Sequence, residues 1–159
     1  MTRIKRNTGK GLERQVELAG QWYRQNGLAW LERTEPPQRW VNGNPVNVRP
    51  ALADFLGAYW ADRYESVPVA VECKSIAGHH PDGLTLAKVL PRVDQRERLH
   101  AASKFWQVMV VVETDLGRGV MYHVAEMTDA RFGVGAIRLE PCRLLPNGAP
   151  DFLGLKEAR

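Results

Sequence analysis

The sequence predicts an α/β protein in which a mixed β-sheet is flanked by helices. Near the start of the chain, apolar residues recur at amphipathic-helix spacing, at Leu12, Val16, Ala19 and Tyr23. The run 108–112 is almost purely β-branched, as is typical of a buried central strand. Helical and strand-like segments alternate along the chain, an order that favours helices packed on a mixed sheet. At 159 residues, the chain is expected to form one domain, residues 1–159.

The first helix is expected to begin at Thr8, whose hydroxyl can cap it, and to end at Asn26-Gly27. A strand is predicted at 28–32. Residues 36–50 contain several prolines around the turn sequence Asn42-Gly43. Because proline does not fit a central strand, we expect this segment to be a projecting hairpin or loop.

In the middle of the chain, strands are expected at 53–60 and 67–74, and a loop at 77–83. A helix is predicted at 92–104. Its expected inward residues include Val93, Leu99 and Ala102.

Towards the C-terminus, Gly117-Arg118-Gly119 predicts a turn into a strand at 120–124, and a helix is expected at 126–132. The residues that follow are rich in Gly and Pro, so no further elements are assigned. We treat 126–159 as a C-terminal extension of the single domain, with no structure predicted for most of it.

The composition favours an anionic partner and a cytoplasmic location. The formal net charge is +4 and the sequence pI is about 9.3. Cys73 and Cys142 match no zinc spacing, so both are interpreted as reduced thiols of a cytosolic protein. The basic first residues lead into no apolar stretch, and no apolar run approaches the roughly 20 residues of a membrane span. We therefore expect a soluble, cytoplasmic protein with no membrane partner.

The strongest functional signal is Asp54 followed by Glu72-Cys73-Lys74. Glu72 and Lys74 end an apolar run, and their i, i+2 spacing on a strand directs both side chains to one face. Two converging carboxylates suit Mg²⁺ or Mn²⁺, and the backbone carbonyl of Cys73 would supply a third oxygen. A lysine beside such a site can position a water and stabilise charge on a phosphate. Metal-dependent cleavage of a phosphodiester is the leading interpretation.

Each candidate also has a structural interpretation. Asp54 could be a turn residue at a strand end, and Glu72 and Lys74 could form an ion pair on an exposed strand face. Glu13, at the edge of the first helix's apolar stripe, could reach inward as a catalytic residue or metal ligand, although glutamates at helix starts are common because of the helix dipole. Gln95 could orient a water or bind phosphate, or it could be an ordinary residue of the helix surface.

Several segments, taken in order, resemble the PD-(D/E)XK nucleases and, more narrowly, the RecU-type Holliday junction resolvases. They are the glycine-containing opening Asn7-Thr8-Gly9-Lys10-Gly11-Leu12-Glu13, the helix end Trp22-Tyr23-Arg24-Gln25-Asn26-Gly27, Arg33-Thr34-Glu35-Pro36-Pro37, Asp54-Phe55-Leu56-Gly57, Glu72-Cys73-Lys74-Ser75 and Gln95. The resemblance covers residues 7–125. Asp94 stands where the family usually has histidine, which bears on the DNA contacts of this helix.

The resemblance implies a restriction-endonuclease-like fold and a homodimer that nicks two opposed strands of a four-way DNA junction with a divalent metal. It implies that Glu13, Asp54, Glu72, Lys74 and Gln95 are the active-site residues. Asp54 and Glu72 would hold the metal, with Glu13 as a further ligand. Residues 36–50 correspond to the stalk that enters the junction in this family.

Basic and aromatic residues outside this set are the candidates for DNA contact: Arg3, Lys5, Arg6, Lys10, Arg39, Trp40, Arg49, Arg92 and Arg96. The alternatives are a solvated terminus and helix surface, and a Trp40 that packs against the body or a partner subunit. The adjacent His79 and His80 invite a metal interpretation, but they are interpreted as ordinary loop residues. Two rival functions remain: another DNA repair or restriction-type endonuclease of the same fold, and a non-catalytic DNA-binding module.

Overall fold

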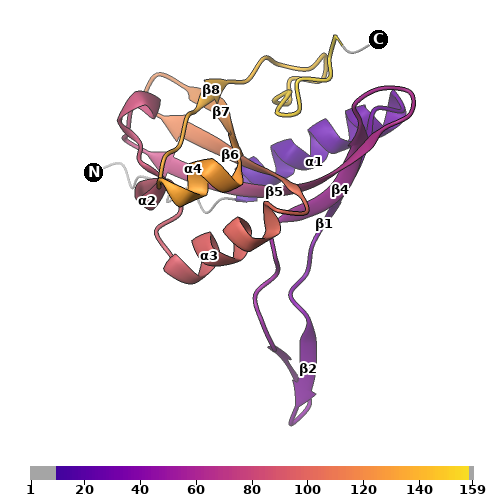
Figure 1. Cartoon of the computed structure of the whole chain (residues 1–159), viewed down its shortest axis with the longest axis vertical. Helices are drawn as coiled ribbons and strands as arrows, with labels where there is room; N and C mark the ends of the chain where they lie inside the picture. The colour runs from indigo at the N-terminus through magenta and orange to yellow at the C-terminus, as the bar shows by residue number, and fades with distance from the viewer. Residues whose placement is uncertain (1–9, 158–159) are drawn as a thin grey trace.

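The computed structural model describes residues 10–157, over which the chain forms a mixed α/β fold (Figure 1). The large sheet has the strand order β1-β4-β5-β6-β7-β8, in which β5 and β6 are parallel and the other neighbours are antiparallel. Its strands are β1 (Ala29–Arg33), β4 (Phe55–Trp60), β5 (Ser66–Ala77), β6 (Gln107–Asp115), β7 (Val120–Met127) and β8 (Glu140–Pro141). The helices are α1 (Lys10–Gln25), the 3₁₀ turn η1 (Pro81–Gly83), α2 (Leu86–Val89), α3 (Val93–Ala102) and α4 (Asp129–Gly133). The prediction of a mixed sheet flanked by helices is confirmed.

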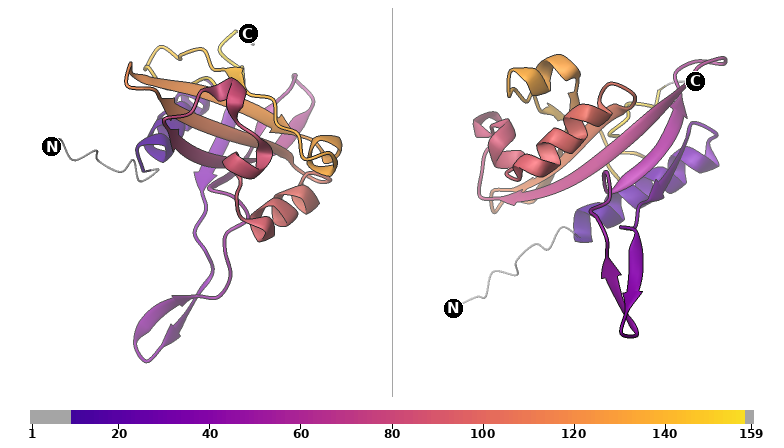
Figure 2. Two further views of the ribbon diagram at one scale, coloured as in Figure 1. Left: turned by 90° about the vertical axis from the view of Figure 1, so that its left-hand side faces the viewer. Right: turned by 60° about the horizontal axis from the view of Figure 1, so that its bottom comes forward.

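The sheet has helices on both faces, and alternate residues of β5 pack against each layer. Val69 and Val71 join α1 in one apolar cluster, which includes all four residues of the predicted α1 stripe. Ala70 packs with Leu99 of α3 in the cluster on the other face. Figure 2 shows α1 and α3 on opposite sides of the sheet. No helix within residues 10–157 is both long and apolar enough to cross a membrane.

A separate two-stranded antiparallel sheet, β2 (Gln38–Val41) with β3 (Asn44–Asn47), extends away from the body (Figure 1). Its turn residues Asn42 and Gly43 have φ angles of 50° and 76°. Positive φ at both central positions is the requirement of a type I′ turn, which explains the Asn-Gly pair. All residues of both strands are exposed.

The helix predictions need three corrections, which concern the orientation of one residue, one boundary and two elements that were missed. Val93 does not face inward, because its side chain is 56% exposed. The inward stripe of α3 is Gln95, Leu99 and Ala102, which share one face at helical spacing, whereas Val93 lies off that face. The predicted helix at 126–132 is shortened because β7 continues to Met127, which is buried and pairs with Val108. The short helix α2 and the turn η1 were not predicted.

Most of the buried residues after α4, for which no elements were predicted, pack on the α1 side of the sheet, whereas Ile137 and Leu139 pack on the α3 side. Phe152 is buried in the α1 cluster and contacts the Tyr23 ring edge to face. The Tyr23 hydroxyl donates to Oδ1 of Asp151 at 2.7 Å. The same carboxylate accepts the backbone N–H groups of Leu155 and Lys156, each at 3.0 Å. Asp151 therefore closes the last turn of the segment and attaches it to α1.

Candidate active site

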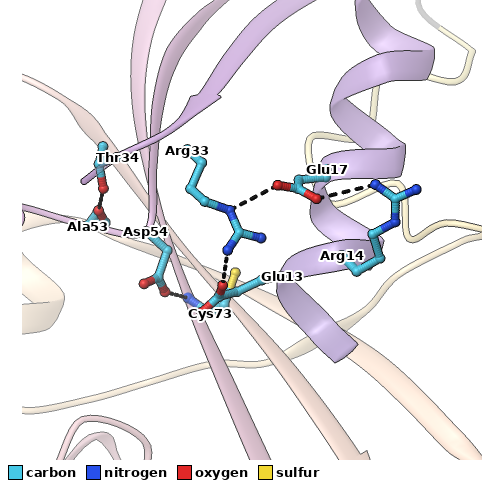
Figure 3. Close-up of polar contacts among 8 residues, drawn as sticks. All are labelled: Glu13, Arg14, Glu17, Arg33, Thr34, Ala53, Asp54 and Cys73. Atoms are coloured by element: carbon cyan, nitrogen blue, oxygen red, sulfur yellow. Dashed lines mark hydrogen bonds and ion pairs between the residues drawn. The ribbon is translucent and has the colours of Figure 1, made fainter. Parts of the chain in front are cut away.

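Asp54 immediately precedes β4, at the point where β5 continues beyond its pairing with β4 and remains paired with β6. The last pair of the β4–β5 ladder is Phe55 with Val71. One step beyond it, Oδ2 of Asp54 accepts the backbone N–H of Cys73 at 2.8 Å (Figure 3). The carboxylate thus takes the place that a backbone carbonyl of β4 would occupy if the ladder continued. This bond fixes the Asp54 side chain beside the Glu72-Cys73-Lys74 segment.

Glu72 is held from two sides. Its side chain is 5% exposed, and Nζ of Lys74 lies 2.9 Å from Oε1. The side-chain amide of Gln95, on α3, donates to the same oxygen. The Glu72–Lys74 ion pair is therefore present, but its carboxylate is buried rather than on an exposed face. Gln95 is itself buried and is not a surface residue of its helix.

The two carboxylates are costly to ionise where they lie. Burial raises the pKa of Asp54 above its usual 3.8, against the hydrogen bond from Cys73 and the charge of Lys74, which lower it. Burial also raises the pKa of Glu72, and the negative charge of Asp54 raises it further. Two desolvated carboxyl groups this close favour either a bound proton or a bound cation.

Glu13 lies on the other side of β5. Cys73 packs in the α1 cluster, whereas its neighbours in the strand face α3. Figure 3 places Glu13 beside the side chain of Cys73. Oε2 of Glu13 lies 2.6 Å from Nη1 of Arg33, and Nε of that arginine is 2.9 Å from Oε1 of Glu17. Glu13 is thus held by Arg33, and the β5 backbone separates it from Glu72.

Arg33 is a site residue that the sequence did not single out. It ends β1, is paired with Phe55 of β4, and its positive charge lowers the pKa of Asp54. The pairing of β1 with β4 brings it there, and nothing in the local sequence predicts that pairing.

A cleft of about 550 Å³ opens over this region. Asp54, Glu72 and Gln95 line it on the acidic side. The rest of its lining comes from the base of the β2–β3 hairpin and from the arginines of α3 and its start, and comprises Thr34, Pro36, Asn47, Val48, Arg49, Pro50, Ala51, Ala53, Arg92 and Arg98. Acidic groups therefore meet arginines in one cavity.

The other DNA-contact candidates are distributed more widely. Arg39 and Trp40 lie on β2, away from the cleft, and Lys10 is exposed at the start of α1. Arg96 does not line the cleft; its Nη1 donates to the carbonyls of Leu90 and Pro91. Three candidates, Arg3, Lys5 and Arg6, lie outside the described residues, as does Thr8.

His79 and His80 lie in the exposed loop before η1. Nδ1 of His80 accepts the backbone N–H of Asp82, so this side chain caps the 3₁₀ turn. This local role agrees with their interpretation as loop residues.

The metal-ligand set available here is a pair. Among residues 10–157, no group of three or more His, Cys, Asp and Glu side chains is arranged to hold a metal ion. The pair Asp54 and Glu72 fits a magnesium site, because Mg²⁺ keeps several waters and is commonly bound by one or two carboxylates together with substrate phosphate. A set of three carboxylates that includes Glu13 is not formed in this arrangement.

Comparison with known proteins gives no family assignment: no family model matches the chain, and no curated protein matches it.

Proposed function

We propose that this protein is a metal-dependent endodeoxyribonuclease, and specifically a homodimeric resolvase of four-way DNA junctions with a restriction-endonuclease-like fold. The observation that carries the proposal is the pair formed by the half-buried Asp54 and the buried Glu72, in a cleft whose walls hold Arg49, Arg92 and Arg98. Carboxylates bind a hard cation and arginines bind phosphate, so a phosphodiester fits both halves of the cavity.

The roles of the side chains follow from their positions. Asp54 and Glu72 would hold Mg²⁺, for which Mn²⁺ can substitute. The backbone carbonyl of Cys73 is a third candidate ligand, since the N–H of Cys73 faces Asp54 and both polar groups of a strand residue point to the same side. The bound ion would activate a water for in-line attack and neutralise charge on the phosphate.

Lys74 and Gln95 act around Glu72. Both contact its Oε1, so they hold the carboxylate in one orientation within the cleft. Lys74 does not itself line the cleft, but it adjoins Glu72 and would contact the attacking water and the phosphate that is cut. Glu13 lies on the opposite face of β5, where it is paired with Arg33. It would have to leave Arg33 before it could bind a second metal.

Two features favour branched DNA as the substrate. The hairpin carrying Arg39 and Trp40 extends from the body, and its base forms part of the cleft wall. A mostly exposed tryptophan next to Arg39 suits stacking on unpaired bases at a junction centre. One chain carries one such cleft, so paired cuts require two chains, and a two-fold dimer matches the approximate symmetry of a four-way junction. We place this activity in the cytoplasm, where Cys73 and Cys142 stay as free thiols.

The decisive experiment is incubation of the protein with a labelled four-way junction and a matched linear duplex, with and without Mg²⁺. We expect paired symmetric nicks in the junction alone, and only with the metal. Equal cutting of both substrates would favour a repair or restriction-type endonuclease instead.

Replacement of the outer part of the hairpin, residues 38–46, by a short turn leaves the cleft lining in place and separates these two enzymes further, since a resolvase should lose its junction preference and a duplex cutter should keep its substrate. The non-catalytic alternative is addressed by Asp54→Asn, which should bind junctions without cutting them. Wild-type cutting by Asp54→Asn would overturn the active-site assignment.

A further inference from the structure

Arg98 lies in the wall between two cavities. It projects from α3 and lines both the acidic cleft and a neighbouring cavity of about 510 Å³. The second cavity has a largely apolar lining that includes Pro37, Leu52 and Leu56, and it contains none of the candidate catalytic residues. Arg49, from the hairpin base, also lines both cavities. Thr34, Pro50 and Ala51 line both cavities as well, so Arg49 and Arg98 are the charged residues at the passage between the two cavities.

The hydrogen-bonding capacity of Arg98 is incompletely used. Its Nη1 lies 3.3 Å from Oδ2 of Asp94, and its Nε is buried without a hydrogen-bond partner among residues 10–157. Asp94 is engaged more closely by Arg92, through Nη2 at 2.7 Å and Nε at 3.2 Å. A buried N–H without an acceptor is costly, and the Arg98 side chain is 28% exposed, so an anion that reached the guanidinium and bonded to Nε would remove that cost.

We propose that Arg98 and Arg49 together bind one phosphate of the DNA strand at this passage, next to the phosphate that is cut. The proposal rests on the function proposed above and adds a position on the strand to it. A guanidinium can present two parallel N–H groups to phosphate oxygens, and the unpartnered Nε of Arg98 belongs to such an edge. Asp94 holds Arg98 at its Nη1 end, which keeps the side chain against the cavity wall before DNA binds.

The test measures junction binding in the Asp54→Asn background, so that cutting does not interfere. Arg98→Gln should weaken binding about 10-fold and reduce the slope of log K against log salt by about 1. Arg98→Lys keeps the charge but not the fork, so it should keep the salt slope and lose part of the affinity. The matched control is Arg143→Gln, since Arg143 is also paired with an acidic residue, Glu157 at 2.8 Å, but lies outside both cavities. Thermal melting checks that each variant is folded.

A second measurement locates the contact. Replacing single phosphates of the junction by neutral methylphosphonates should weaken binding at several positions. At one position beside the cut, this loss should disappear in Arg98→Gln, because the charge pair is already broken.

Unchanged affinity and salt slope in Arg98→Gln, with cutting intact in a protein carrying Asp54, would overturn this proposal alone. Binding that depends on Arg98, together with a wild-type protein that cuts no DNA, would overturn the nuclease and support the phosphate contact. No binding of DNA by any variant would overturn both.

Discussion

The side-chain amide of Gln95, on α3, donates a hydrogen bond to Oε1 of Glu72, on β5. That oxygen is also 2.9 Å from Nζ of Lys74. A helix and a strand are thereby joined at one carboxylate oxygen, and the orientation of Glu72 depends on a residue distant in sequence.

Gln95→Ala should weaken metal use more than it weakens the fold. Removing a group that orients a metal ligand typically costs 10–100-fold in metal affinity or activity, so we expect the Mg²⁺ concentration for half-maximal cleavage to rise about 10-fold or more. A titration of cleavage rate against Mg²⁺ measures it. Gln25→Ala, at the exposed end of α1, is the control and should leave the titration unchanged. The same Mg²⁺ dependence in both variants would contradict a positioning role for Gln95.

Asp54→Asn should alter the pH dependence of stability. Because burial raises the pKa of Asp54 in the folded protein, the stabilising contribution of the protonated group is complete below its usual pKa of 3.8 and is lost as pH rises through the raised value. The free energy of unfolding of the wild type should therefore fall over that window, and Asn should remove this loss. Denaturant unfolding at a series of pH values measures it.

Asp94 serves as a control, because its pKa is shifted in the opposite direction to that of Asp54. Its pKa is lowered, first by the hydrogen bonds from Arg92, so its contribution is present above pH 3.8 and lost as pH falls through the lowered value. If the stability of Asp54→Asn had the same pH profile as that of the wild type, burial would not be raising the pKa of the Asp54 carboxyl group.

Trp40→Ala should reduce junction binding without affecting the body of the protein. The side chain is 74% exposed, so its removal should change stability by no more than about 0.5 kcal/mol. Loss of one base-stacking contact, about 1–3 kcal/mol, should weaken binding of a four-way junction about 10-fold or more and leave duplex binding unchanged. Fluorescence anisotropy with both DNAs measures this, with the half-exposed Trp60 of β4 replaced by Ala as control. A loss of dimer mass in Trp40→Ala would instead place Trp40 in a subunit interface.

Tyr23→Phe should loosen the C-terminal segment. The hydroxyl donates to Asp151 and accepts the backbone N–H of Leu153, and burial raises the pKa of Tyr23. Losing these bonds should cost about 1–3 kcal/mol of unfolding free energy, measured by chemical denaturation. Glu157→Gln breaks only an exposed pair with Arg143 and should cost no more than about 1 kcal/mol. Equal effects of both changes would mean that Asp151 does not attach this segment.

The elements that could be predicted from the sequence were those whose pattern of apolar residues shows which face is buried. The apolar stripe of α1 and the β-branched run of β6 are periodic or continuous, so each shows which face is covered. The i, i+2 spacing of Glu72 and Lys74 placed both on one face, and the ion pair follows from it. Gln95 was predicted as a site residue only through the family resemblance. Its burial beside Glu72 depends on how α3 packs against the sheet.

The remainder depends on pairing between distant segments. Arg33 reaches Glu13 only because β1 pairs with β4, where a Cβ on Gly57 would come within 1.9 Å of the backbone oxygen of Trp30. The C-terminal segment has little regular structure, so Phe152 is buried by a turn that no periodicity marks. Arg98 belongs to a group of basic residues around α3 that suits phosphate binding, but the sequence does not show which of these residues line the two cavities.

Thr34, which precedes the hairpin, is hydrogen-bonded to Ala53 and Asp54 at the candidate site. The backbone N–H of Thr34 donates to the carbonyl of Asp54 at 2.9 Å. The hydroxyl of Thr34 donates to the carbonyl of Ala53, as Figure 3 shows. If DNA displaced the hairpin, these two hydrogen bonds would have to break or Asp54 would have to move with the hairpin. Through these bonds, the strand that leads into the hairpin is tied to Asp54, so a displacement of the hairpin would be transmitted to the candidate site.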